Sequence, residues 1–288
     1  MLLSIILSLL VVLLWSYGDI NYTKLSLKLE KMNVYFYQYF IKSIIYLFVT
    51  FIFNISLFKT FNITHFLIFS PVIFCDLAAS IAIYYAVSRG KLSIVSPIMA
   101  SYPIITIFLG IILLHEKPSY LSILLSMIIT VSIIVLSTIS SNDNKKKNYK
   151  RGILYAIVYM FLIAFSTYFE KDIYNNNLTI YELYYYKGLV YLLTSFFFLI
   201  TLLISKKKFH KLNKDIIRGS ILIPTGNVFY SLAISLGDII YIAPITSMYS
   251  ILTNYLSVNI LKEKLSITER IAISLIILST ILLIIISL

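Results

Sequence analysis

Two segments of the sequence indicate the fold most clearly: residues 90–119, GKLSIVSPIMASYPIITIFLGIILLHEKPS, and residues 237–266, GDIIYIAPITSMYSILTNYLSVNILKEKLS. After a shift of 147 positions the second segment repeats the first, with polar residues, glycine and proline in the same order. The matched pairs are Gly90 and Gly237, Pro97 and Pro244, Tyr102 and Tyr249, Thr106 and Thr253, Glu116 and Glu263, and Lys117 and Lys264. In an apolar chain, leucine and isoleucine are expected to match by chance. Glycine, proline and polar residues are not expected to match by chance in the same order. We therefore predict an internal duplication.

The rest of the chain has the composition of a membrane protein. Of its 288 residues, 60% are hydrophobic and 12% are charged, and the mean hydropathy is +0.93. A typical soluble domain has about 25% charged residues, so we exclude a soluble enzyme, a disulfide scaffold, a disordered chain and a nucleic-acid binder. A helix needs about 20 apolar residues to cross a bilayer. The apolar runs predict ten such helices, at residues 2–20, 34–57, 65–88, 92–114, 119–140, 151–170, 178–204, 216–236, 239–261 and 267–287.

The duplication divides these helices into two groups of five. We assign residues 1–141 to the first half, residues 142–150 to a basic linker and residues 151–288 to the second half. Because five is an odd number, the second half must cross the membrane in the opposite direction. We therefore predict an all-α integral membrane protein whose ten transmembrane helices form two inverted five-helix repeats. Many secondary transporters have this plan and bind substrate near the midplane, between the repeats.

Basic residues are distributed unevenly over the predicted loops. Of the 24 lysines and arginines, 19 follow the odd-numbered helices, three follow the even-numbered helices, and Lys42 and Lys187 lie within spans. Cytoplasmic loops carry an excess of Lys and Arg. We therefore expect the odd-numbered loops in the cytoplasm, both termini outside, and the protein in the cell (plasma or inner) membrane.

These features resemble the drug/metabolite transporter superfamily, and in particular its ten-helix EamA-type transporters. The resemblance covers nearly the whole chain. It is carried by the two repeated segments, each ending in Glu-Lys, by Lys42 and Lys187 in the second helix of each half, and by Trp15. It implies a central cavity lined by helices 1–4 and 6–9, with helices 5 and 10 at the periphery. It also implies cytoplasmic termini, opposite to the orientation that the charge count predicts and that we keep.

Two charged residues within predicted spans are candidates for a functional site, because such residues are costly in a membrane. Asp76 lies near the middle of its helix, and Lys42 about a third of the way along the preceding one. If these helices are adjacent, the two side chains can form an ion pair. Such a pair either only fixes the packing of the two helices, or Asp76 binds a proton or a cationic group in competition with Lys42.

Other charged residues also have competing interpretations. Lys187 either lines the cavity or snorkels to the interface near Glu182. Asp19 either marks the end of the first helix or lines the mouth of the cavity. Glu170 and its two charged neighbours are expected at a solvated helix end.

Pro97 and Pro244 lie about one turn into their helices, where each frees a backbone carbonyl from its helical partner. In a membrane such a carbonyl is tolerated where it faces protein or a water-filled cavity. We therefore expect the fourth and ninth helices to line the cavity or, alternatively, to pack closely through small residues. The candidate substrate-binding residues are Trp15, Lys42, Asp76, Tyr84, Pro97, Tyr102, Lys187, Asn227, Pro244, Tyr249 and Asn254.

We predict a secondary active transporter, an exporter or exchanger of a small metabolite or drug-like solute that works by alternating access. The alternative is a flippase for a lipid carrier or a lipid-linked substrate, with an amphiphilic cavity open to lipid. A membrane-embedded enzyme is less favoured, because the three histidines match no metal-ligand spacing. We expect no catalytic residue, metal or cofactor and no nucleic-acid partner. The expected partners are a small-molecule substrate and membrane lipid, with the chain a monomer or a homodimer.

Overall fold

The computed structural model describes residues 2–54, 56, 61–115, 119–121, 123–125, 128, 149–206, 208–260 and 266–287. Most of the predicted linker, the Glu-Lys pairs of the repeat and most of the predicted helix at 119–140 lie outside these residues. Within the described residues every long regular element is an α-helix, as predicted. Seven helical segments among them are long and apolar enough to cross a membrane.

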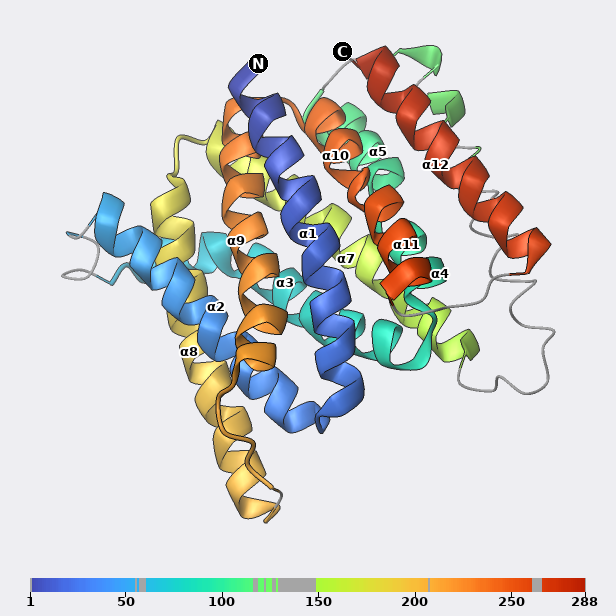
Figure 1. Cartoon of the computed structure of the whole chain (residues 1–288). Coiled ribbons are helices and arrows are strands. Elements are labelled where there is room, and N and C mark those ends of the chain that lie inside the picture. Colours follow the sequence, from blue (N-terminus) through green and yellow to red (C-terminus); the bar gives the residue numbers. More distant parts are fainter. Residues whose placement is uncertain are drawn as a thin grey trace.

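The helices pack into one bundle (Figure 1). In the first half they are α1 (Leu2–Lys28), α2 (Lys31–Phe53), α3 (Ile63–Arg89), α4 (Leu92–Met99) and α5 (Pro103–Leu113). In the second half they are α7 (Tyr149–Asn175), α8 (Ile180–Ile204), α9 (Lys214–Leu236), α10 (Ile239–Ser247), α11 (Tyr249–Ile260) and α12 (Ile267–Ser287).

Helix α1 continues well beyond its predicted end at residue 20. Its polar residues Asp19, Tyr22 and Thr23 are 4% exposed or less, because neighbouring helices cover them. They therefore face protein and not water, which hydropathy alone does not reveal. The expectation that Asp19 marks the end of the first helix is wrong.

Each of the predicted helices at 92–114 and 239–261 is broken in two. Helix α4 ends at Met99, and α5 begins at Pro103. Proline has no N–H and its ring clashes with the carbonyl one turn earlier, so a continuous helix is disfavoured there. Helix α10 ends at Ser247, and α11 begins at Tyr249 in the corresponding place of the second half.

The carbonyl that Pro97 frees is used in a contact between the two halves. The helical partner that Pro97 cannot bind is the carbonyl oxygen of Ser93, four residues earlier. This oxygen accepts a hydrogen bond of 2.9 Å from Asn254 Nδ2 in α11. The freed carbonyl thus faces protein, and it joins α4 to α11.

Three long helix pairs form the centre of the bundle: α1 with α9, α3 with α7, and α2 with α8. In the α2–α8 pair, Asn33 at the start of α2 contacts Lys208 just after α8, and Thr50 near the end of α2 contacts Tyr181 at the start of α8. The two helices are therefore antiparallel. In the other two pairs, contacts likewise join the end of one helix to the start of the other, so these pairs are antiparallel too.

Two glycines allow the end of α3 to touch the start of α7. A Cβ atom on Gly152 would lie 2.6 Å from the backbone N of Gly90 and 2.8 Å from its Cα. Backbone atoms cannot rotate away as a side chain can, so this approach requires glycine. The contact sets the distance between α3 and α7, the two helices that supply the carboxylates described next.

Candidate functional site

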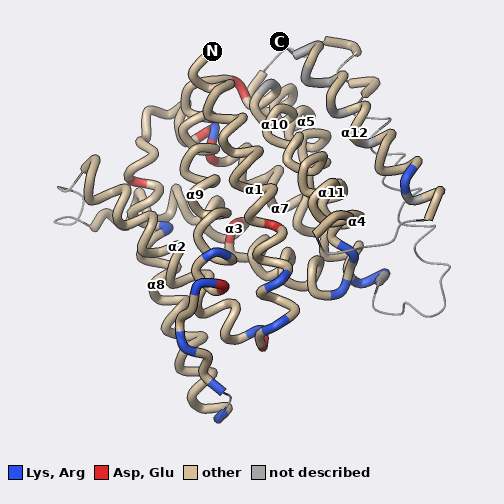
Figure 2. The backbone as a smooth tube through the Cα atoms, viewed as in Figure 1, with Lys and Arg blue, Asp and Glu red and all other residues tan. Residues whose placement is uncertain are grey.

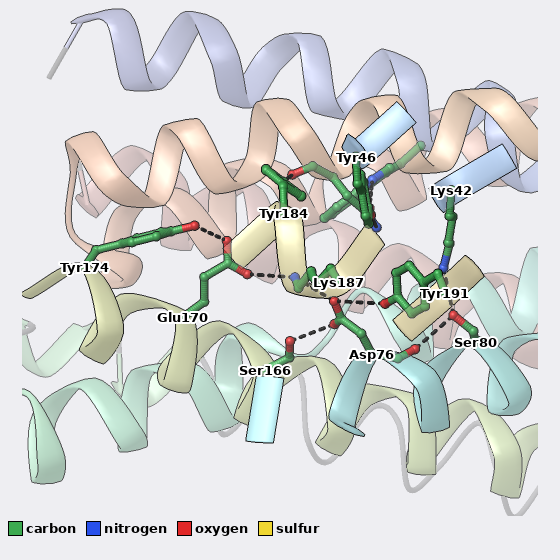
Figure 3. A network of polar contacts seen from close by, with 12 residues as sticks. Lys42, Tyr46, Asp76, Ser80, Ser166, Glu170, Tyr174, Tyr184, Lys187 and Tyr191 are labelled. Atoms are coloured by element: carbon green, nitrogen blue, oxygen red, sulfur yellow. Dashed lines mark hydrogen bonds and ion pairs between the residues drawn. The ribbon is translucent and has the colours of Figure 1, made fainter. Parts of the chain in front are cut away.

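A buried ion triad, formed by Asp76, Glu170 and Lys187, joins three helices at the centre of the bundle (Figure 3). Lys187 Nζ of α8 lies 2.7 Å from Asp76 Oδ2 of α3 and 3.4 Å from Glu170 Oε2 of α7. The side chains of Lys187 and Glu170 are 3% and 5% exposed. Because unpaired charges are costly away from water, a lysine shared by two carboxylates constrains the positions of all three helices.

Hydroxyl groups bind the remaining oxygens of the two carboxylates. Ser166 Oγ donates to Asp76 Oδ1 at 2.7 Å, and Tyr174 OH donates to Glu170 Oε1 at 2.7 Å. Ser166, Glu170 and Tyr174 are spaced four residues apart, which places them on one face of α7. Every carboxylate oxygen of the triad therefore has a partner, as buried polar atoms generally do.

Lys42 does not pair with Asp76, contrary to the prediction. Its Nζ atom donates a hydrogen bond of 2.7 Å to Ser80 Oγ, and Asp76 pairs with Lys187 instead. The reason is the arrangement of the helices: α3, which carries Asp76, packs against α8 more extensively than against α2. The lysine on α8 therefore reaches the carboxylate more closely than the lysine on α2.

A cavity lies next to the ion triad, with an empty volume of about 650 Å³ counted with its opening. Five candidates from the sequence line it: Trp15, Lys42, Asp76, Lys187 and Asn227. The other lining residues are Gln38, Ala79, Ser80, Ile83, Tyr159, Ile163, Ser166, Thr167, Glu170, Ile223, Tyr230 and Ser231. Charged groups, hydroxyls, two amides and an aliphatic surface thus meet in one space.

Trp15 and Asn227 form one wall of this cavity. Trp15 Nε1 donates to Asn227 Oδ1 at 3.0 Å, and Asn227 Nδ2 donates to Tyr46 OH at 3.1 Å. The indole ring lies 5.0 Å from the ring of Tyr230, measured between centroids. A Cβ atom on Gly226 would lie 2.6 Å from the indole Cδ1, so this glycine leaves room for the tryptophan.

The remaining six candidates do not line this cavity: Tyr84, Pro97, Tyr102, Pro244, Tyr249 and Asn254. Tyr102, for example, is 1% exposed, and its hydroxyl lies 2.6 Å from Thr246 Oγ1. The expected lining by the fourth and ninth helices is wrong for this cavity, because the broken helices pack against each other, α4 on α11 and α5 on α10. The alternative of close packing describes them. Asp19 does not line the cavity either.

Comparison with known families identifies this architecture. The sequence profile of the EamA-like transporter family matches residues 2–138 and, a second time, residues 150–285. The chain belongs to the EamA-like transporter family. A solved structure titled only "Crystal structure of protein" is similar over 99% of this chain and 98% of that chain, with a TM-score of 0.67 and 12% sequence identity, and so supports the fold alone. No curated protein matches the sequence significantly.

This EamA-like transporter is a multi-pass membrane protein, and its family is one of transporters and not of enzymes. The resemblance read from the sequence is confirmed. Family membership implies transport of a small solute across the membrane, and the two profile matches indicate duplicated halves.

Sequence reasoning missed Glu170, whose predicted place at a solvated helix end is wrong. Helix α7 continues to Asn175, and Glu170 is 4% exposed. A signal for it exists in the sequence: Tyr159, Ile163, Ser166 and Glu170 follow one another at spacings of four, three and four residues. Such spacing places them on one face of a helix, and all four line the cavity of the transporter.

Proposed function

We propose that this EamA-like transporter is a secondary transporter, which moves a small metabolite or drug-like solute by alternating access between two inverted halves. The observation that carries the proposal is the cavity beside the ion triad, lined by helices of both halves. Charged residues deep in a membrane protein mark substrate or ion pathways by default. The boundaries we propose are residues 1–141 and 151–288, joined by the linker at 142–150.

Helix packing supports the inversion of the halves. Helices α2 and α8 occupy corresponding places in the two profile matches, and they are antiparallel. The counterpart of α1 in the second half is α7, and the counterpart of α9 in the first half is α3. Exchanging each helix for its counterpart therefore turns the packed pair α1–α9 into the pair α7–α3, which is also packed. A two-fold axis in the membrane plane produces this exchange, as in many transporters built from inverted repeats.

The distribution of charge supports two alternating states. Lys42 and Lys187 correspond after a shift of 145 residues, yet only Lys187 is bound by carboxylates. The two halves therefore hold equivalent lysines in different environments. The charged lining also favours a polar solute over the amphiphilic cargo of a lipid flippase.

We expect a cysteine in the cavity to react from both sides of the membrane. Cys75 is the single native cysteine of the chain, so the test uses Ile163→Cys together with Cys75→Ser. An impermeant thiol reagent is applied to right-side-out and to inside-out vesicles. The control is Ile98→Cys, at a position that is 0% exposed and outside the cavity lining. Labelling of Ile163→Cys from one side only under all conditions contradicts alternating access. A channel would give the same labelling but also a conductance, which we do not expect.

We propose that the odd-numbered loops are cytoplasmic. Figure 2 shows basic residues gathered at the end of the bundle where α8 ends and α9 begins, and such an excess is typical of the cytoplasmic side. In intact cells, an impermeant reagent should label Asn177→Cys, between α7 and α8, but not Lys28→Cys at the end of α1. Both native side chains are exposed. The reverse pattern would place the termini in the cytoplasm.

A further inference from the structure

We propose that Lys42 and Gln38, on one face of α2, form a subsite that binds the carboxylate group of the transported solute. This inference rests on the proposed transport function, since it concerns the same cavity. Both residues line that cavity, and they are spaced four residues apart, so their side chains lie one helical turn from each other.

Lys42 has a charge that the described protein does not neutralise by direct contact. In the described residues, no carboxylate oxygen lies within 4.0 Å of its Nζ atom, whereas both carboxylates of the ion triad lie that close to Lys187. Lys42 is only 5% exposed, so bulk water does not solvate its charge. A buried ammonium group in this position favours an anionic ligand.

Ser80 binds only one of the protons of Lys42. Ser80 Oγ donates its own proton to the backbone oxygen of Asp76 at 2.9 Å and accepts from Lys42 Nζ at 2.7 Å. An ammonium group has three donors. Two N–H groups of Lys42 therefore remain for a ligand, beside the ring of Tyr191, whose centroid is 5.5 Å from Nζ.

Gln38 provides a second, independent observation. It is 3% exposed, and its Nε2 atom has no hydrogen-bond partner in the described part of the chain. Buried amide donors are nearly always bound. Because Gln38 lines the same cavity as Lys42, one helical turn away, its NH₂ group is available to a ligand bound there. A carboxylate there accepts from both residues, one oxygen for each.

The apolar lining of the cavity suits the body of a small solute. Ala79, Ile83, Ile163 and Ile223 supply aliphatic surface, and Trp15 and Tyr230 supply aromatic surface. Two kinds of solute present a carboxylate with an apolar body: a simple organic anion, and a zwitterion whose ammonium group would face the carboxylates of the ion triad. The subsite is the same for both.

Four probes with the same phenyl ring test the subsite: phenylacetate, phenylalanine, phenethylamine and phenylacetamide. Binding is measured as the rise in melting temperature of the purified full-length protein in detergent. We expect phenylacetate, phenylalanine or both to raise the melting temperature, and the amine and the neutral amide to leave it unchanged. A response to phenylacetate alone identifies the anion, and a response to phenylalanine alone identifies the zwitterion; either result supports the subsite.

Variants connect the response to the two residues. Lys42→Met should abolish it and Lys42→Arg should retain it, while Gln38→Leu should raise the apparent dissociation constant about tenfold, the equivalent of one hydrogen bond to a charged group. Lys28→Met is the control, because that lysine is on the surface and pairs with Asp215. If Lys42→Met does not fold, Gln38→Leu alone tests the subsite.

The subsite is overturned if neither carboxylate binds the wild type, if phenethylamine binds in their place, or if the Lys42→Met or Gln38→Leu variant binds them as the wild type does. The cavity-cysteine experiment keeps this failure separate from failure of the transport proposal. Labelling of Ile163→Cys from both sides without binding of either carboxylate rejects the subsite and leaves alternating access standing.

Discussion

Replacement of Lys187 by methionine is expected to lower the free energy of unfolding by about 3–5 kcal/mol, as for other buried ion pairs that lose one partner. Methionine fills similar space but leaves Asp76 and Glu170, whose side chains are 14% and 5% exposed, without a cation. The measurement is thermal unfolding of the purified protein in detergent, compared with the wild type. We expect a large drop in the melting temperature.

Three control variants separate charge from shape. Lys187→Arg keeps the positive charge and should unfold closer to the wild type. Lys42→Met removes the equivalent lysine of the other half and should cost less, because within the described residues Lys42 is bound to the Ser80 hydroxyl and not to a carboxylate. Combining Lys187→Met with Asp76→Asn and Glu170→Gln should recover stability, since the three positions of the ion triad then hold no uncompensated charge. Equal melting temperatures for Lys187→Met and Lys42→Met would contradict the role of the ion triad.

The second large effect is expected from Gly152→Ala, which should lower the free energy of unfolding by about 1–3 kcal/mol through overpacking. The added methyl group would lie 2.6 Å from the backbone N of Gly90, so α3 and α7 must move apart. This separation strains the contact between Ser166 and Asp76 further along the same helices. Thermal unfolding in detergent measures the effect.

Gly237→Ala is the matched control, because Gly237 is the repeat counterpart of Gly90. A Cβ atom there would meet Ile242 Cδ1 at 3.1 Å and Ser4 Oγ at 3.2 Å, both at the ends of side chains that can shift. We expect this variant to unfold near the wild type. A Gly152→Ala protein as stable as Gly237→Ala would show that the backbone contact is not tight.

Much of the helical arrangement could be predicted because hydropathy and repetition are properties of the chain itself. The predicted spans at 65–88 and 267–287 agree closely with α3 and α12. The end of α1 was misplaced because Asp19 and Thr23 are polar but buried against other helices. Hydropathy reports the average environment of a segment, and a polar residue that faces protein is indistinguishable from one that faces water.

The candidate site was predictable in part for the same reason. Lys42, Asp76 and Lys187 stand out in the sequence because they interrupt apolar runs. Glu170 does not stand out, because it is next to Lys171 and Asp172 and has the local pattern of a helix end. Its burial depends on the neighbours of α7, which are distant in the chain.

The amino-acid sequence by itself determined that this protein belongs in a membrane, that its halves are duplicated and that it is an EamA-like transporter. These properties follow from composition, from apolar run length and from the order of residues along the chain. Only the tertiary structure decided that Asp76 pairs with Lys187 and not with Lys42. An ion pair forms over a few ångströms, so its partners depend on which helices become neighbours, and here α3 packs against α8 more extensively than against α2, its expected neighbour.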